Sequence, residues 1–386
     1  MKIFYAGFDI EGVGGIATYS RHQIRALKTL GCDVFALSID KQDKFAERGL
    51  VDRRFGFDGK TSTVVRALTT MTGQRFDAVM VNHVYLAGLG LAARRFRRTP
   101  YAINVYNIDI LCSLPRWREF AFARADLVMA DCRYTIANMP KFHPQIPPTG
   151  LLYDPVDVSF FRPIPAAAAR AEVMKRFPAI GDISDRFVCV TVAHMAGPPN
   201  NNKGHRQTIE ALARMKDPRF LYLVVGDGPD RAAIEAHVRA HGVEDSVFLA
   251  GLVPQDALPF LYACADAAIL IAKGGPGLGE AVPLGLLEAA AAGVPFICGD
   301  EDGSIEAIDP ARPNGIAISP MDIDALVAAL RRLAGDEAAR RAMGVNGKHV
   351  VDDVFRFERF VEVQGRLLAQ HLGFRGAKAR ARPEAA

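Results

Sequence analysis

Short apolar runs alternate with longer amphipathic stretches along almost the whole chain, and this alternation limits the possible folds more than any other feature. Runs of the strand type cover residues 2–7, 33–39, 77–83, 100–106 and 125–131 in the first half, and 187–193, 220–227, 247–252, 267–272 and 294–300 in the second. Strands that are separated by helical segments are typical of parallel sheets with helices on both faces. The sequence therefore predicts two successive doubly wound α/β units.

The length of 386 residues exceeds what one hydrophobic core usually supports, which also favours two domains. Prolines at positions 155, 163, 165 and 178 interrupt regular structure between the two groups of strands. We expect an N-terminal domain over residues 1–165, a C-terminal domain over residues 178–352, and a closing amphipathic helix at about 355–372. Residues 373–386 are basic and poor in bulky apolar side chains, so we expect a flexible tail.

Composition excludes several classes of protein. Half of the residues are apolar, and the net charge of +4 is too small to indicate a nucleic-acid-binding protein. The six cysteines are scattered without a CxxC pair, so we interpret them as reduced thiols and not as metal ligands. The N-terminus resembles a strand more than a signal peptide, and no apolar run reaches the roughly 18 residues of a membrane span. We expect a cytoplasmic protein, and peripheral contact with a membrane stays open.

Gly12, Gly14 and Gly15 follow the first strand and precede a helix. Glycines in this position let backbone N–H groups approach a phosphate, and the helix dipole adds partial positive charge. The dinucleotide fingerprint is incomplete, because Thr18 follows three residues after Gly15 and Asp33, the acidic residue about 20 positions on, precedes a strand. A tight turn without a ligand is the alternative.

Glu280 and Glu288 lie in the segment GEAVPLGLLEAAAAGVP. Pro283 is tolerated in the first turn of a helix, so we expect a helix from this residue to Gly293, with Glu280 in the preceding loop and Glu288 on the helix. Eight helical residues span about 12 Å. Because this exceeds the separation of about 5 Å found between paired catalytic carboxylates, we expect the two glutamates to hold different parts of one long ligand.

Other loops in the second half carry weaker signals. Lys203 precedes an amphipathic helix, where its ammonium group would neutralise a diphosphate; a solvated lysine is the alternative. Gly226 and Gly228 end a buried strand, where glycines more often serve turn geometry than binding. We interpret the acidic run at 300–302 as a solvated loop and not as a metal site.

Polar residues also end two strands of the first half. His83 follows the third strand, and Tyr106, Asn107 and Asp109 follow the fourth. Carboxyl ends of parallel strands are where open α/β sheets bind ligands, so an acceptor molecule is expected there. A histidine with only a structural role is the alternative for His83.

In this order, the segments resemble the GT-B-fold glycosyltransferases of family 4, a group of retaining enzymes. The resemblance covers nearly the whole chain and is carried by the glycine loop after the first strand and by the segments ADLVMADCRYT, YDPVDVSFF, KGH, VVGDGPDR, FLAGLVP, GEAVPLGLLEAAAAGVPFI and FRFERF. It implies two Rossmann-like domains that face each other across a cleft, with the C-terminal helix returning to the N-terminal domain.

The resemblance also implies a function and a set of roles. The N-terminal domain would bind the acceptor and the C-terminal domain a nucleotide-sugar, without a metal or other cofactor, for transfer to a glycan or lipid-linked acceptor in polysaccharide or lipopolysaccharide biosynthesis. Glu280 would contact the transferred sugar, Glu288 the donor ribose and Lys203 the diphosphate. Further donor contacts would come from Gly14, Gly15, His194, Gly226 and Val253, and acceptor contacts from His83, Tyr106, Asn107 and Asp109, with His83 as a second catalytic candidate.

This chain departs from the common family pattern at several positions. His194 stands where the family usually has arginine, the frequent EGFG sequence reads EAVP at 280–283, and Tyr106 replaces a common histidine. A nucleotide-sugar epimerase of similar architecture and a non-catalytic binding protein of the same shape are therefore the alternatives.

Four arginines, Arg94, Arg95, Arg97 and Arg98, surround Phe96 in the first half. Such a cluster would bind an anionic membrane surface with about 1 kcal/mol per basic residue. The alternative is a basic helix end that favourably faces its own dipole.

Overall fold

The computed structural model describes residues 1–41, 47–56, 60–197, 203–274 and 278–376. Contacts divide the chain into two compact units, residues 1–155 with 357–386, and residues 156–356. Residues 156–165, which we expected in the N-terminal domain, therefore lie in the second unit. Most of the predicted tail, residues 377–386, lies outside the described residues.

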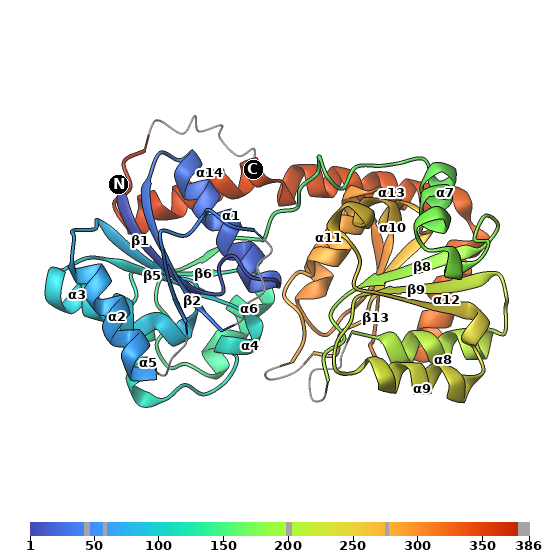
Figure 1. Cartoon of the computed structure of the whole chain (residues 1–386), viewed down its shortest axis with the longest axis horizontal. Coiled ribbons are helices and arrows are strands. Elements are labelled where there is room, and N and C mark those ends of the chain that lie inside the picture. Colours follow the sequence, from blue (N-terminus) through green and yellow to red (C-terminus); the bar gives the residue numbers. More distant parts are fainter. Residues whose placement is uncertain (42–46, 57–59, 198–202, 275–277, 377–386) are drawn as a thin grey trace. The chain divides into compact units, whose positions relative to one another are not determined.

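The first unit contains a parallel sheet of seven strands in the order β3-β2-β1-β4-β5-β6-β7 (Figure 1). Its strands are β1 (Lys2–Phe8), β2 (Asp33–Asp40), β3 (Arg53–Gly56), β4 (Ala78–Val81), β5 (Tyr101–Val105), β6 (Leu127–Ala130) and β7 (Thr149–Leu151). The chain runs outward from β1 to β3 and then returns to β4 on the other side of β1. This switch point is where doubly wound sheets commonly bind ligands.

Helices cover both faces of this sheet. They are α1 (Gly15–Thr29), α2 (Lys60–Thr72), α3 (Ala87–Arg97), α4 (Asn107–Ile110), α5 (Arg116–Phe122), α6 (Arg133–Asn138) and α14 (Phe357–His371). Ile3 and Tyr5 of β1 belong to the apolar cluster that includes α1 and α14, whereas Phe4 and Ala6 belong to the cluster under α2 and α3. The alternation follows the two-residue period of a strand, so both faces of β1 are buried.

The closing helix α14 belongs to the first unit, as expected. It lies against α1, where the rings of Phe360 and Tyr19 meet edge to face with centroids 5.7 Å apart. Leu367 packs over Gly150 of β7 so closely that a Cβ at Gly150 would lie 2.3 Å from its Cδ2.

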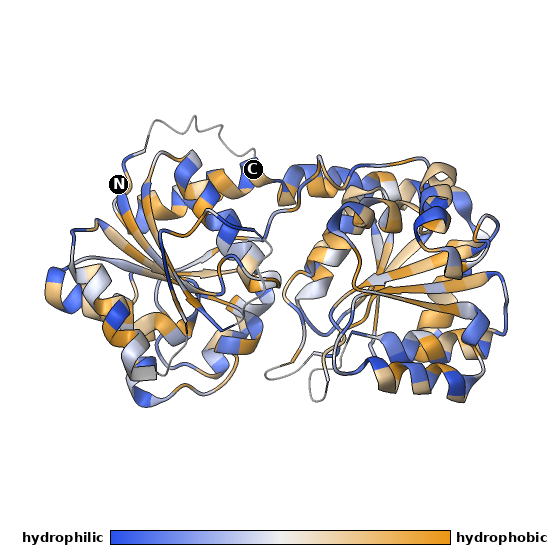
Figure 2. Cartoon of the chain, in the orientation of Figure 1, coloured by the Kyte–Doolittle hydropathy of each residue, from blue (hydrophilic) through white to orange (hydrophobic). Residues whose placement is uncertain are grey.

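The second unit contains a parallel sheet of six strands in the order β10-β9-β8-β11-β12-β13. Its strands are β8 (Phe187–Val192), β9 (Phe220–Val225), β10 (Val247–Gly251), β11 (Ala267–Leu270), β12 (Phe296–Gly299) and β13 (Gly315–Ile318). Its helices are α7 (Ala166–Arg176), α8 (His205–Met215), α9 (Arg231–His241), α10 (Leu258–Ala263), α11 (Leu284–Ala291), α12 (Ile323–Gly335) and α13 (Glu337–Val350). Figure 2 shows mainly apolar strands and helices with one polar face, as expected for a sheet covered on both sides.

Three strands, β3, β7 and β13, were not predicted. Each has three or four residues. All three are edge strands of their sheets. A short edge strand lacks the long apolar run that marks a central strand, which explains the omission. In the described part of the chain, no helix is both long and apolar enough to cross a membrane.

Candidate functional site

The candidate donor residues of the second unit gather at the carboxyl edge of its sheet. Lys203 follows the loop after β8, and α8 begins two residues later behind Gly204, whose φ of 82° is in the left-handed region. Glu280 lies in the loop between β11 and α11. The Lys203 Nζ forms an ion pair with Glu280 Oε1, and both side chains keep about a fifth of their surface exposed (20% and 21%). A phosphate therefore has access to a lysine that already lies beside the candidate sugar-binding carboxylate.

Asp302 holds the backbone of Glu280 in place. Its Oδ2 accepts a hydrogen bond of 2.7 Å from Glu280 N, and its Oδ1 accepts one of 2.9 Å from Ser304 N. The interpretation of the 300–302 run as a solvated loop was wrong for Asp302, which is only 1% exposed. Two backbone donors compensate the burial of its carboxylate, although burial still raises the pKa of Asp302 to about 6.

Glu288 lies on α11, the helix predicted from Pro283. The helix covers Leu284–Ala291, and Pro283 precedes its first turn. The buried Tyr262 of α10 donates a hydrogen bond of 2.6 Å to Glu288 Oε2. Sequence reasoning missed Tyr262, because one tyrosine in the apolar segment LPFLYA carries no signal of a polar contact. The bond restricts the rotamer of Glu288.

The turns at Gly226 and Gly228 bring the loops after β8 and β9 together. Gly226 has φ of 129°, and a Cβ there would lie 2.0 Å from Ala193 O. Gly228 has φ of 157°, and a Cβ there would lie 2.7 Å from His194 Cε1. Only glycine fits either position. Close packing with the loop of the exposed His194 therefore requires glycine at both positions.

Three further candidate donor contacts lie elsewhere in the chain. Val253 follows β10 and is half-buried. Gly14, with φ of 126°, precedes α1 in the first unit, and a Cβ on Gly14 or Gly15 would meet no described atom within 4 Å. The N-terminus of α1 therefore has room for a ligand beside its backbone.

The candidate acceptor residues gather at the carboxyl edge of the first sheet. His83 follows β4 and caps a short 3₁₀ turn, with its Nδ1 accepting a hydrogen bond of 3.2 Å from Tyr85 N. The neutral ring then carries its proton on Nε2. In this tautomer Nε2 is a hydrogen-bond donor and cannot act as a general base.

Asp109 lies beside His83 and shapes the same edge. Its Oδ1 accepts a hydrogen bond of 2.7 Å from Tyr106 N, and its Oδ2 lies 3.3 Å from His83 Nδ1. Burial raises the pKa of Asp109 to about 7 and lowers the pKa of His83 to about 4. Both shifts favour a pair without charge.

The Asp109→Asn variant tests this buried pair. The folded-state pKa of Asp109 lies above its unfolded value of 3.8, so its contribution to stability falls as pH rises from 3.8 to about 7. His83 has the opposite effect, because its contribution to stability is lost as pH falls from 6.5 to about 4. The contributions of the two groups therefore partly cancel in the pH dependence of wild-type stability. The unfolding free energy of Asp109→Asn, taken relative to wild type, is expected to rise by about 2 to 3 kcal/mol between pH 5 and pH 8. Urea unfolding at both pH values measures this, and an equal difference at both would contradict it.

Sequence reasoning also missed Asp131, which follows β6 at the same edge. Its Oδ1 is a buried atom without a hydrogen-bond partner among the described residues, and burial raises the pKa of Asp131 well above its usual value. The Tyr106 hydroxyl is likewise buried and without a partner there. Asn107 is buried beside it. An acidic residue after a strand was visible in the motif ADLVMADCRYT, but its burial depends on tertiary packing.

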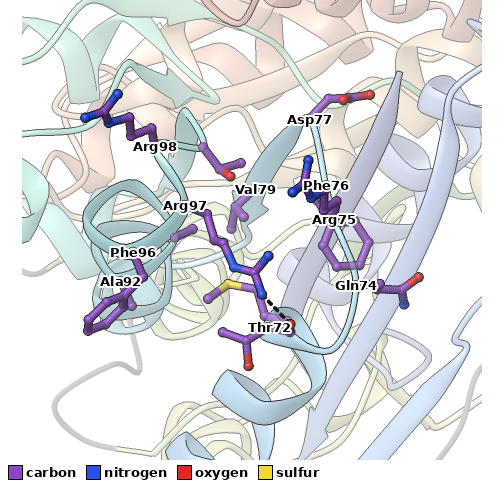
Figure 3. A pocket seen from close by; sticks show the side chains of 13 residues that line it. Thr72, Gln74, Arg75, Phe76, Asp77, Val79, Ala92, Phe96, Arg97 and Arg98 are labelled. Carbon is purple, nitrogen blue, oxygen red and sulfur yellow. Dashed lines mark hydrogen bonds between the residues drawn. The ribbon is translucent and has the colours of Figure 1, made fainter.

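The arginines around Phe96 lie at the opposite, amino edge of the first sheet. Arg94 pairs with Asp126 at 2.6 Å, and Arg97 donates a hydrogen bond of 2.9 Å to Thr72 O. Phe96 remains 73% exposed. Together with Arg75 and Phe76, Phe96 and Arg97 line a pocket of about 420 Å³ (Figure 3).

Comparisons with known proteins agree with this architecture. Residues 190–350 match the family described as glycosyl transferases group 1, and residues 14–145 match the glycosyl transferase 4-like domain. The chain belongs to the group 1 glycosyltransferases of the GT-B fold. It is 29% identical over 272 residues to a GDP-mannose-dependent alpha-(1-6)-phosphatidylinositol monomannoside mannosyltransferase of Mycolicibacterium smegmatis, in an alignment that covers 68% of each chain. An alignment with the Mycobacterium tuberculosis enzyme of the same description covers 54% of that enzyme.

Solved structures show that this glycosyltransferase shares its fold with distant proteins. Sucrose-phosphate synthase from Thermosynechococcus elongatus superimposes with a TM-score of 0.78 at 19% identity, covering 96% of this chain and 98% of that one. Anabaena HepE in complex with UDP superimposes with a TM-score of 0.77 at 16% identity, covering 96% of this chain and all (100%) of HepE. In this glycosyltransferase, the region that matches the glycosyl transferase 4-like domain contains His83 and Asp109. The region that matches the group 1 family contains Lys203, Glu280 and Glu288.

Proposed function

We propose that the chain transfers a sugar from a nucleotide-sugar to a hydroxyl group of a glycan or lipid-linked acceptor, with retention of anomeric configuration. The observation that carries this proposal is the pairing of Lys203 with Glu280 at the edge where Tyr262 also orients Glu288. The mannosyltransferase relatives support it, because they are described as GDP-mannose-dependent and act on a phosphatidylinositol glycolipid. The fold of HepE, which has been crystallised with UDP-glucose, is compatible with it.

In this proposal Lys203 and the N-terminus of α8 bind the donor diphosphate. An ammonium group and a helix dipole both attract phosphate. The diphosphate would replace Glu280 as the ion-pair partner of Lys203. The Glu280 carboxylate would then accept hydrogen bonds from sugar hydroxyls. As the bond between sugar and phosphate breaks, Lys203 stabilises the negative charge that grows on the leaving diphosphate.

The anomeric configuration would be retained because the acceptor hydroxyl attacks the same face of the sugar from which the diphosphate departs. The leaving phosphate is itself a base close to the acceptor hydroxyl, so it would take the proton of that hydroxyl. Glu280 would stabilise the positive charge of an oxocarbenium-like transition state. Neither the transfer nor its stereochemistry requires a covalent bond to the protein in this scheme, and no cofactor takes part.

The Glu288→Ala variant is expected to raise the Kd for the nucleotide about 100-fold, because a carboxylate that accepts two hydrogen bonds from a ribose is lost. Tyr262→Phe keeps the carboxylate and removes only the hydroxyl that orients it, so a smaller increase of about 5-fold is expected. Isothermal titration calorimetry with nucleoside diphosphates measures both. Equal affinities in wild type and Glu288→Ala would remove the assignment of Glu288 to the ribose.

A thermal-shift screen of GDP-, UDP- and ADP-sugars identifies the donor, because a ligand that binds the folded protein raises its Tm. GDP-mannose comes first, given the description of the relatives. Conversion of the donor without an acceptor would indicate an epimerase, and binding without any turnover would indicate a binding protein. If none of these sugars changed the Tm, the proposed function would be wrong.

We also propose that the protein works in the cytoplasm and contacts an anionic membrane through Arg94, Arg95, Arg97 and Arg98. Phe96 between them is 73% exposed, which places an aromatic ring beside the cations. Phe120 of the neighbouring α5 is also 48% exposed. Such a surface suits an enzyme whose acceptor carries a lipid, in polysaccharide or lipopolysaccharide assembly.

Liposome flotation tests the membrane contact. The wild type is expected to float with vesicles that contain anionic lipid and to stay in solution with neutral vesicles. Arg95→Gln combined with Phe96→Ser should abolish flotation, whereas Arg214→Gln, which removes an exposed arginine of the second unit, should not. Flotation that is independent of anionic lipid would contradict the electrostatic contact.

A further inference from the structure

A second cluster of polar side chains lies on α8 and α9, which run side by side in the second unit (Figure 1). Glu210 comes from α8, and His237 and His241 come from α9, four residues apart and hence on one face of that helix. One ligand atom from each of the three side chains lies within 4.8 Å of the others. The function derived above uses none of these residues.

The two histidines are arranged as metal ligands usually are. His237 Nε2 lies 3.3 Å from Glu210 Oε1, and it is a buried nitrogen without a hydrogen-bond partner among the described residues. His241 Nδ1 lies 2.9 Å from the carbonyl oxygen of His237, to which it can only donate. This bond fixes the tautomer of His241 and leaves Nε2 with a lone pair, as in histidines whose ring is oriented by a backbone carbonyl at a metal site.

The donor set suits zinc. Two imidazoles and one carboxylate are a common three-residue set for Zn²⁺, with water as the fourth ligand. A tetrahedral ion with ligands at 2.0–2.2 Å holds donor atoms about 3.4 Å apart. Small rotations of these partly exposed side chains would shorten the separations between the three ligand atoms, which are at most 4.8 Å, to that spacing.

We propose that Glu210, His237 and His241 bind one zinc ion that ties α8 to α9. Arg206 and Asp230 already join the same two helices near their N-termini, with Nη2 2.9 Å from both carboxylate oxygens. Glu210 lies within α8, five residues or about 7.5 Å beyond its first residue, His205, whereas Lys203 precedes the helix. The ion therefore belongs to the support of the helices and takes no part in sugar transfer.

Zinc titration of the chelator-treated full chain tests this site. Calorimetry is expected to show one ion bound per chain in the wild type. His237→Gln and His241→Gln are each expected to weaken binding at least about 10-fold, because loss of even an outer-shell partner costs 10- to 100-fold. His349→Gln is the matched control, since it removes an exposed histidine from α13 and should leave the affinity unchanged.

Thermal unfolding separates lost binding from lost folding. In the presence of EDTA, the wild type and the two variants should share one Tm, and zinc should raise the Tm of the wild type only. Equal zinc affinity in the wild type and in both His237→Gln and His241→Gln would overturn the proposal. Binding that does not saturate at one equivalent would also overturn it, since it would mean an adventitious ion only. Neither result would affect the assignment of the nucleotide-sugar site, which the Glu288→Ala titration tests separately.

Discussion

Replacement of Glu280 by glutamine is expected to lower kcat/KM for sugar transfer about 100-fold and to change nucleotide affinity by less than about 3-fold. A hydrogen bond to a charged group contributes about 1.5–3 kcal/mol, and the negative charge of Glu280 gains importance as positive charge develops on the sugar. Because Glu280 is the partner of Lys203, its neutralisation also releases the lysine toward the diphosphate. The effect should therefore appear in transfer and not in binding.

Steady-state kinetics and nucleotide titrations on the same preparations measure the two effects separately. Glu337→Gln is a suitable control, because it removes one negative charge from an exposed position on α13 (59% exposed) and should behave as wild type. If Glu280→Gln lost nucleotide affinity and transfer to the same extent, Glu280 would hold the nucleotide and not the transferred sugar.

Replacement of Gly226 by alanine is expected to destabilise the second unit by at least about 3 kcal/mol. Its φ of 129° is unfavourable for any side chain, and the new Cβ would lie 2.0 Å from Ala193 O, so the loops after β8 and β9 would have to separate. For a unit of this size the loss corresponds to a fall in Tm of about 6 to 12 °C.

Gly242→Ala is the matched control for this prediction. Gly242 ends α9 with φ of 63°, and its Cβ would meet no described atom within 4 Å. It should cost only about 1–2 kcal/mol, the usual penalty of a left-handed residue. Calorimetric unfolding compares the two variants. An equal fall in Tm would show that backbone conformation, and not the contact with Ala193, decides the cost at Gly226.

The sequence predicted the central strands and the helix from Pro283 because their signals are local. Continuous apolar runs mark strands that are buried on both faces, and the edge strands β3, β7 and β13 lack them. The sequence also indicated a diphosphate contact for Lys203 and a ligand contact for Glu280, because both follow strands of the second half. Their ion pair, which joins residues 77 positions apart, depends on the strand order and was not predicted.

The supporting residues of the site were harder to predict than the candidate ligands. Asp302 looked like part of a solvated acidic run, because sequence alone does not show that Glu280 N and Ser304 N point at its carboxylate. Tyr262 and Asp131 were missed for the same reason. Their importance lies in burial and partners, which tertiary packing decides, whereas glutamate, lysine and glycine are recognisable by type and spacing.

A crystal structure with a nucleotide-sugar or nucleoside diphosphate bound tests the central claim most directly. The diphosphate is expected within hydrogen-bonding distance of the Lys203 Nζ, with the ribose hydroxyls on Glu288 and any sugar beside Glu280. A nucleotide bound away from the carboxyl edge of β8, β9, β11 and β12, or one that leaves both glutamates without contact, would contradict the proposed site.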